Sequence, residues 1–184
     1  VWHALQLERV VEATNTATTL YKYIEPYKEI AIKALFKWRM SNQSTYENPE
    51  DEIAAMQFLG SRGGNRYLIE YIGAYQDQDN VYSLMEYHHG GELYGAVCKR
   101  PLSQERSRRY LIQTVEGLRY CHSHGVAHKD MSLENILYVR EGQEDYVKII
   151  DFGMCLRVPR HENGSFYYLT PQGACGKKNY MAPE

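Results

Sequence analysis

Short apolar runs separated by turn-forming residues dominate the first half of the chain. Runs of this kind, with many β-branched and aromatic residues, are typical of strands. They predict strands over residues 5–12, 18–24, 30–36, 67–75 and 81–87, the last two forming a hairpin around residues 77–80. Asn48 can cap a helix that starts at Pro49 with an acidic first turn and ends near Gly60, which predicts a helix over residues 49–59. We therefore expect a small antiparallel sheet with one helix.

The pattern becomes helical after the Gly90-Gly91 pair. Ser103 can cap a long helix that Gly125 is placed to stop. The apolar residues of this helix fall on one stripe, formed by Leu111, Val115 and Leu118. Two short strands are predicted beyond it, over residues 136–139 and 147–150. Residues 151–184 show little periodicity, and loops of such length are usually functional or disordered.

The composition is that of a single globular domain: 184 residues, 43% of them apolar. The 21 basic and 23 acidic residues leave a formal charge of −2, which gives no electrostatic reason to expect nucleic acid or an anionic membrane as the main partner. No apolar run is long enough to span a bilayer. The four cysteines lack Cys-x-x-Cys spacing and the histidines lack metal-ligand spacing, which favours a reducing, cytoplasmic setting without a zinc site.

Four motifs stand in a fixed order along the chain. They are Ile30-Ala31-Ile32-Lys33, His128-Lys129-Asp130 with Asn135 five residues after the aspartate, Asp151-Phe152-Gly153, and Ala182-Pro183-Glu184. With this set the chain resembles the catalytic domain of eukaryotic-type protein kinases over essentially its whole length. The resemblance implies a two-lobed α+β fold within one domain, residues 1–184. Its β-rich N-lobe would cover residues 1–87 and the start of a helical C-lobe residues 88–184, incomplete after Ala-Pro-Glu and therefore exposing apolar surface.

The resemblance assigns ATP and Mg²⁺ to a site between the lobes. Asp130 would accept the proton of a substrate hydroxyl, while Asn135 and Asp151 would supply the oxygen ligands that Mg²⁺ prefers. The plain alternative is that these three side chains only cap turns, as Asp and Asn often do.

Lys33 is expected, by the same resemblance, to contact the α and β phosphates and to be held by an ion pair with Glu52. Its neighbours Glu50 and Asp51 compete for that role.

An adenine site is implied on both sides of the cleft. Ala31, on the same strand face as Lys33, would cover the base from one side, and Leu137 would form the opposite wall. Met85-Glu86-Tyr87-His88 looks like the family's hinge, with Met85 as gatekeeper and with the Glu86 carbonyl and His88 amide contacting adenine.

The chain departs from the family in its first hairpin. The family carries a glycine-rich loop over the phosphates, whereas residues 13–18 contain threonines that disfavour positive φ. We therefore expect weak backbone contact with phosphate and weaker nucleotide binding. Lys129 replaces the usual arginine, so control by loop phosphorylation at Thr170 or Ser165 should be weaker.

A second departure is paired. The family's Ser/Thr kinases usually carry a lysine two residues after the catalytic aspartate and a threonine in the loop before Ala-Pro-Glu; here these positions hold Ser132 and Lys177. One hypothesis is that the two groups have exchanged places, with Lys177 supplying charge to the γ-phosphate and Ser132 orienting Asp130. The alternative is that Lys177 is an ordinary solvated lysine.

The function expected from the resemblance is phosphoryl transfer from ATP to a protein hydroxyl, favouring Ser/Thr. Two alternatives stay open. The missing glycines would fit a pseudokinase, a non-catalytic scaffold for partner proteins. A small-molecule kinase of related fold would share the Asp and Asn of the catalytic loop, but the Asp-Phe-Gly and Ala-Pro-Glu motifs belong to protein kinases.

Overall fold

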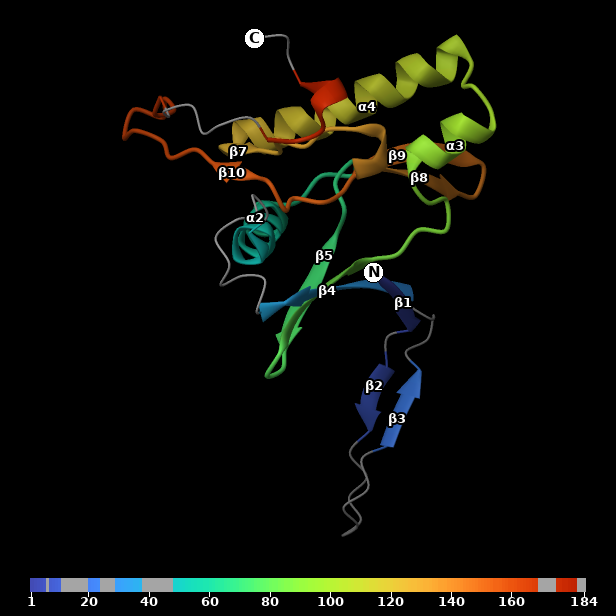
Figure 1. The fold of residues 1–184 in the computed structure, drawn as a ribbon, viewed down its shortest axis with the longest axis vertical. Helices are drawn as coiled ribbons and strands as arrows, with labels where there is room; N and C mark the ends of the chain where they lie inside the picture. Colours follow the sequence, from blue (N-terminus) through green and yellow to red (C-terminus); the bar gives the residue numbers. More distant parts are fainter. Residues whose placement is uncertain (6, 11–19, 24–28, 38–47, 169–174, 182–184) are drawn as a thin grey trace.

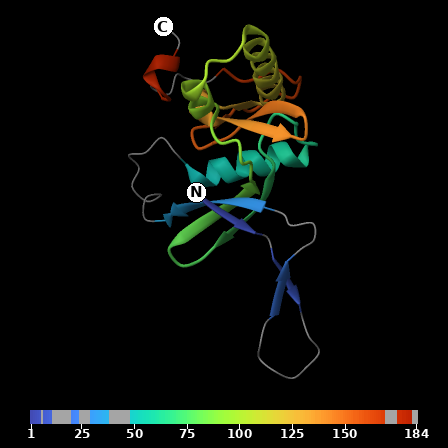
Figure 2. The same ribbon diagram turned by 90° about the vertical axis from the view of Figure 1, so that its right-hand side faces the viewer.

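The structure, a computed structural model, describes residues 1–5, 7–10, 20–23, 29–37, 48–168 and 175–181 (Figure 1). Within the described residues, a β-rich part with one helix lies at one end, and a part with two α-helices and two two-stranded ladders lies at the other. In Figure 2, α2 (Pro49–Ser61, teal) crosses between the blue and green sheet and the helical part. This arrangement confirms the α+β fold class.

The β-rich part is built on a four-stranded antiparallel sheet in the order β1-β4-β6-β5. Its strands are β1 (Trp2–Leu5), β4 (Glu29–Phe36), β6 (Asn80–Glu86) and β5 (Tyr71–Gln76). The predicted strand over 30–36 and the hairpin are confirmed, although β5 begins at Tyr71 rather than at residue 67. Asp77 fixes the hairpin turn by accepting hydrogen bonds from the backbone N–H groups of Asp79 and Asn80.

The two strands predicted ahead of this sheet are distributed differently from the prediction. β2 (Leu7–Val10) and β3 (Leu20–Tyr23) form a separate two-stranded antiparallel ladder. The run predicted as one strand over 5–12 therefore contributes to two sheets, with β1 beside β4 and β2 beside β3. In Figure 1 the β2–β3 ladder extends beyond the four-stranded sheet, away from the helical part.

Helix α2 (Pro49–Ser61) begins as the sequence predicts. The Asn48 side chain accepts a hydrogen bond from the Glu50 N–H at 3.0 Å, and Pro49 occupies the first turn, where its missing N–H costs nothing. The helix ends one residue past Gly60, and Gly63 and Gly64 take positive φ beyond it. Its buried side is formed by Glu52, Ala55, Met56 and Leu59. A charged residue on this apolar side needs a buried partner.

The helical part contains one helix that the sequence analysis did not predict, α3 (Leu93–Lys99), and the long helix α4 (Gln104–Ser123). The remaining elements are β7 (Val126–Ala127), η1 (Leu133–Asn135), β8 (Ile136–Glu141), β9 (Glu144–Ile149), β10 (Leu156–Arg157) and η2 (Lys178–Tyr180). β8 pairs with β9, and β10 pairs with β7. Ser103 caps α4 by accepting from the Arg106 N–H, and Gly125 follows its end with φ +72°. Both signals were predicted.

The apolar stripe that predicted α4 is for the most part not its buried side: Leu118 packs, partly buried, against the main core, but the other two residues are exposed. Leu111 is 64% exposed and Val115 is 52% exposed. The buried side is formed by Tyr110, Thr114, Gly117 and Cys121. A Cβ at Gly117 would lie 3.0 Å from Ile149 Cδ1, so the glycine lets the helix approach β9 closely. The packing partner, rather than the most apolar stripe, therefore decides which face is buried.

The main apolar core joins the two parts of the molecule. It brings together residues of the sheet, of α2, of α4 and of the segment after β9, among them Ala31, Met56, Leu68, Cys121, Ile149 and Phe152. Within the helical part, Asp145 connects β9 to α4 by accepting hydrogen bonds from Arg106, Arg109 and Tyr110. Within the described ranges, no helix is both long and apolar enough to cross a bilayer.

Candidate active site

Lys33 lies at the centre of the site, on strand β4 between β1 and β6. Its ammonium donates to both carboxylate oxygens of Glu52, at 2.8 and 2.9 Å, and to Asp151 Oδ1 at 2.8 Å. Burial alone would lower the pKa of Lys33, but the charges of Glu52 and Asp151 outweigh it and raise that pKa. The side chain is therefore a fixed cation between two carboxylates.

Of the three neighbouring acids on α2, the structure places Glu52 against Lys33. Glu52 is 2% exposed, whereas Glu50 and Asp51 face solvent. Asp51 instead accepts a hydrogen bond from the Asn48 side chain at 2.7 Å. The predicted ion pair of Lys33 with Glu52 is thus present in the structure.

The loop that follows β9 carries Asp151 and is hydrogen-bonded to the residue just before α2. The Asn48 N–H, just before α2, donates to the Gly153 carbonyl at 3.0 Å. Asp151 itself has φ +64°, a conformation that non-glycine residues adopt rarely and often at functional sites. Burial would raise the pKa of Asp151, but the Lys33 charge outweighs it and lowers that pKa. Asp151 is therefore a carboxylate, with Oδ1 on Lys33.

Asp130 and Asn135 lie together on the loop around η1. The Asn135 amide nitrogen donates to the Asp130 backbone carbonyl and to Asp130 Oδ2, both at 2.7 Å. Asn135 is 6% exposed, so its amide is fixed by these two bonds. Because the nitrogen makes both contacts, the side-chain oxygen remains as the group that can bind a metal ion.

His128 connects this loop to the Asp151 loop, a role that the sequence analysis did not assign. Its ring packs on Phe152, with ring centroids 4.9 Å apart. Nδ1 accepts from the Asp130 N–H at 3.3 Å, so Nε2 carries the proton and donates to the Ile150 carbonyl at 2.9 Å. Burial lowers the pKa of His128, which favours this neutral ring. The sequence signal that could have indicated this role is the position of His128 directly before Lys129-Asp130 in the motif.

Ser132 and Lys177 also lie at Asp130. Lys177 Nζ is 3.2 Å from Asp130 Oδ2 and 2.9 Å from Ser132 Oγ. The Lys177 N–H donates to Asp130 Oδ1 at 3.1 Å. The structure therefore brings together the two positions that the sequence analysis compared, although they are far apart along the chain.

The residues expected to enclose adenine meet in the main core. Ala31 pairs across the sheet with Met85, and Leu137 packs partly buried against the same apolar cluster. Glu86 is the last residue of β6, and His88 follows it by two residues. Ala31, Met85 and Leu137 thus belong to one apolar cluster, and the hinge contacts with adenine stay a prediction.

The side chain of Glu86 has a structural role that was not predicted. It is 2.6 Å from Lys148 Nζ and 3.0 Å from His88 Nε2, and it accepts from the Glu70 N–H at 2.7 Å. Burial would raise the pKa of Glu86, but these hydrogen bonds outweigh it and lower the pKa to about 2. No pattern in the sequence links Glu86 to Lys148, because the contact joins β6 to β9.

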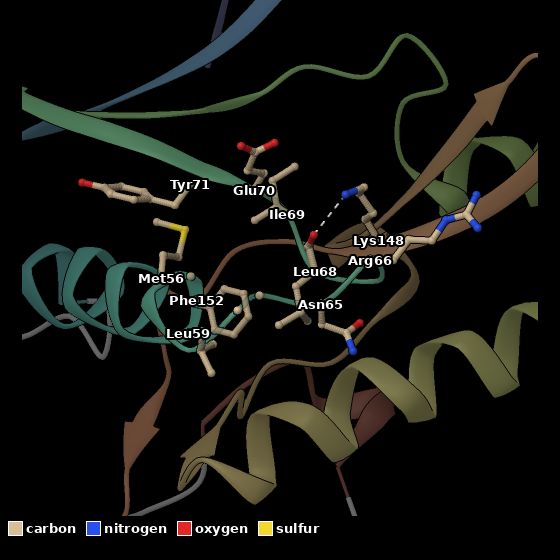
Figure 3. A pocket seen from close by; sticks show the side chains of 13 residues that line it. Met56, Leu59, Asn65, Arg66, Leu68, Ile69, Glu70, Tyr71, Lys148 and Phe152 are labelled. Atoms are coloured by element: carbon tan, nitrogen blue, oxygen red, sulfur yellow. Dashed lines mark hydrogen bonds between the residues drawn. The ribbon is translucent and has the colours of Figure 1, made fainter.

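A separate cavity of about 500 Å³ is lined in part by Phe152 (Figure 3). It is also bordered by Met56 and Leu59 of α2, by residues 63–66 and 68–71, and by Lys148, whose ammonium donates to the Leu68 carbonyl at 3.2 Å. Lys33, Asp130 and Asn135 do not line it. The cavity is therefore distinct from the cluster of catalytic-type side chains.

Some sequence predictions fall outside the described residues. They concern the phosphate loop at 13–18, the phosphorylation candidate Thr170 and the Ala182-Pro183-Glu184 motif. Ser165 is described, and its hydroxyl bonds to Asn163 Oδ1 at 2.7 Å.

The fold and this arrangement define a class. Lys33 of the sheet forms ion pairs with Glu52 of a helix and with Asp151 after β9. A second loop carries Asp130 and Asn135, and His128 connects it to the loop of Asp151. This is the protein kinase type of fold.

Comparisons with known proteins give the same answer. The family model described as "Protein kinase domain" matches residues 16–184. Calcium-dependent protein kinase 25 of Arabidopsis thaliana is 34% identical over 159 residues, which cover 83% of this chain and 30% of the relative. Calcium/calmodulin-dependent serine/threonine-protein kinase 1 of Oryza sativa subsp. japonica is 31% identical over 151 residues, which cover 78% of this chain and 25% of the relative. The chain belongs to the protein kinase family, and it spans about a quarter to a third of the length of these relatives.

Proposed function

We propose that the protein transfers the γ-phosphoryl group of ATP to a serine or threonine hydroxyl of another protein. The observation that carries the proposal is the Lys33 ammonium, held between Glu52 and Asp151 at 2.8–2.9 Å, while Asp130 is held by Asn135. Phosphoryl transfer depends on positioning and on neutralising phosphate charge, which is what these groups can supply. The names of the relatives, among them a serine/threonine-protein kinase, favour a protein substrate and Ser/Thr specificity.

In this proposal the nucleotide lies between an N-lobe of residues 1–87 and a C-lobe that starts at residue 88. Ala31 and Leu137 enclose adenine, and the Glu86 carbonyl and His88 N–H bind its edge. Lys33 binds the α and β phosphates. The substrate hydroxyl donates its proton to Asp130, whose carboxylate accepts from Asn135 and Lys177.

The donor set fits Mg²⁺. The Asn135 side-chain oxygen and the Asp151 carboxylate are hard oxygen ligands, and among the described residues Lys33 holds Oδ1 of Asp151 while no hydrogen bond engages Oδ2. When bound, Mg²⁺ would neutralise charge on the phosphate oxygens. Lys33 positions Asp151 by donating to Oδ1, and Asn48 holds the same loop at Gly153, so these contacts set where the ligand oxygen lies.

The test is transfer of labelled γ-phosphate from ATP to a generic protein substrate by the protein in its full natural length, with Mg²⁺. Asp130→Asn should abolish most transfer, whereas Asp79→Asn, the same change on the exposed β5–β6 turn, should leave it unchanged. Nucleotide binding without transfer would reject the proposal in favour of a scaffold. Transfer to small alcohols but not to protein would reject a protein substrate.

A further inference from the structure

Phosphoryl transfer requires positive charge at the group in flight, and the cations near Asp130 differ in what they can offer. An ammonium has three N–H donors. Those of Lys33 all point to carboxylate oxygens of Glu52 and Asp151, so Lys33 must give up one of these contacts when it binds the α and β phosphates. Lys177 uses one donor on Asp130 and one on Ser132, so within the described residues its third donor is not engaged. Lys177 can therefore bind another anionic oxygen without breaking an existing contact.

The surroundings of Lys177 leave room for such an oxygen. Its side chain is 38% exposed, and that of Asp130 is 13% exposed. The Lys177 side chain is thus the more accessible member of this ion pair, and solvent reaches it.

The backbone fixes this position independently of the lysine side chain. Gly176 has φ +89°, and a Cβ there would lie 2.7 Å from the Lys129 carbonyl oxygen. Only glycine allows the segment to approach the catalytic loop so closely. The Lys177 N–H then donates to Asp130 Oδ1, and the Leu133 N–H reaches the Tyr180 hydroxyl at 3.5 Å. Two backbone groups therefore align the segment against Asp130.

We propose that Lys177 is a catalytic residue that binds the transferred phosphoryl group, and that Ser132 positions its ammonium. This inference rests on the proposed function. In the step, the substrate oxygen forms a bond to the γ-phosphorus while the bond from phosphorus to the β-phosphate oxygen breaks, and ADP leaves with that electron pair. The hydroxyl proton goes to Asp130. Lys177 stays protonated throughout and neutralises charge on the γ-phosphoryl oxygens.

The competing interpretation is that Lys177 only ties its segment to the loop. The two roles make different predictions for nucleotides. A cation at the γ-phosphate distinguishes ATP from ADP, because only ATP carries that group. A purely structural tie would change the affinity for both nucleotides equally, and it would lower stability.

The experiment compares Lys177→Met with Lys178→Met in the full-length protein. Lys178 is the neighbouring exposed lysine, so the control removes the same charge one residue away. The affinities for Mg²⁺-bound ADP and for a non-hydrolysable ATP analogue are measured, together with kcat. Lys177→Met should weaken analogue binding about 10- to 100-fold more than ADP binding, as loss of a hydrogen bond between charged groups implies. It should lower kcat about 100-fold, while Lys178→Met stays within about twofold.

Two further variants separate charge from position. Lys177→Arg keeps the charge and should retain about tenfold more activity than Lys177→Met. Gly176→Ala keeps the lysine but displaces its backbone, so it should lower kcat with little effect on ADP affinity.

The outcomes separate the two proposals. Lys177→Met with near-normal kcat, or with equal losses for both nucleotides, would overturn the catalytic role of Lys177. A second outcome is that the unmodified protein transfers no phosphate but binds the ATP analogue more tightly than ADP, and that Lys177→Met loses this preference. It would overturn the kinase proposal and support phosphate binding by Lys177. If the unmodified protein binds neither nucleotide, both proposals fail.

Discussion

The Lys33–Glu52–Asp151 group makes a quantitative prediction for Glu52→Gln. The substitution keeps the shape of the side chain and removes one negative charge, so the formal charge of the group changes from −1 to 0. Lys33 would keep its 2.8 Å contact with Asp151, and that aspartate would become its sole anionic partner within the group. The Lys33 ammonium would then bind Asp151 more tightly and compete with Mg²⁺ for its carboxylate.

The magnitude follows from the same contacts. Severing a buried ion pair by removing one partner costs about 3–5 kcal/mol when the other charge is stranded. Lys33 is not stranded, because Asp151 remains, and its side chain is 20% exposed. We therefore expect a loss of roughly 1–3 kcal/mol in the free energy of unfolding. Changes to groups that orient a metal ligand typically reduce metal affinity or activity about 10- to 100-fold, and we expect this range for Mg²⁺ affinity and kcat.

The assay is a Mg²⁺ titration of initial transfer rates at saturating ATP, beside chemical denaturation of the same samples. Glu50→Gln is the matched control, since it makes the same change on the exposed side of α2. It should leave kcat and Mg²⁺ dependence unchanged. A Glu52→Gln protein with the same Mg²⁺ midpoint and a kcat within about twofold of the unmodified protein would refute the reasoning, whatever its stability.

Two further predictions concern stability. Gly90→Ala should lower the free energy of unfolding by about 1–3 kcal/mol or more, because its Cβ would lie 1.8 Å from the Tyr138 carbonyl oxygen. Gly60→Ala, on the open surface of α2, should raise it by roughly 0.5–1 kcal/mol. Thermal melts of both variants check this, and equal changes in melting temperature would contradict it. The lowered pKa of Glu86 means that its ionised form stabilises the fold above its ordinary pKa of 4.5, and that this stability is lost as pH falls toward 2. Glu86→Gln should cost on the order of 3 kcal/mol at pH 7 and flatten the stability profile between about pH 5 and 2; an unchanged acid slope in denaturation curves would refute it.

The signals that predicted the β-rich part were local. Capping by Asn48 and the turn at Asp77 act between residues close in sequence, so a short window contains both partners. Helix α3 lacks such a signal: its N-cap, Glu92, makes no side-chain capping bond, and the helix has only seven residues. A short helix without a cap is stabilised by packing, which a single sequence does not display.

The site residues likewise divide into those that a short motif predicts and those that depend on packing between distant elements. Asp130, Asn135 and Asp151 came from the resemblance to protein kinases that the motifs carry. The choice of Glu52 over its neighbours depended on which side of α2 is buried. The stripe through Leu111 predicted helix α4 but not the side on which it packs, because Gly117 offers β9 a closer approach than any large apolar residue.

Assembly of the site requires contacts from two directions at once. Lys33 of the sheet contacts both Glu52 of α2 and Asp151 of the loop after β9, and Lys177 reaches Asp130 from a segment that Gly176 lets lie against the catalytic loop. The two aspartates belong to loops that neutral His128 connects, since one ring nitrogen accepts from Asp130 and the other donates to the residue before Asp151. Displacement of either lysine would therefore be transmitted through one imidazole to the opposite carboxylate. On this reasoning, undocking the segment that carries Lys177 lowers activity even when the nucleotide contacts of Lys33 are intact.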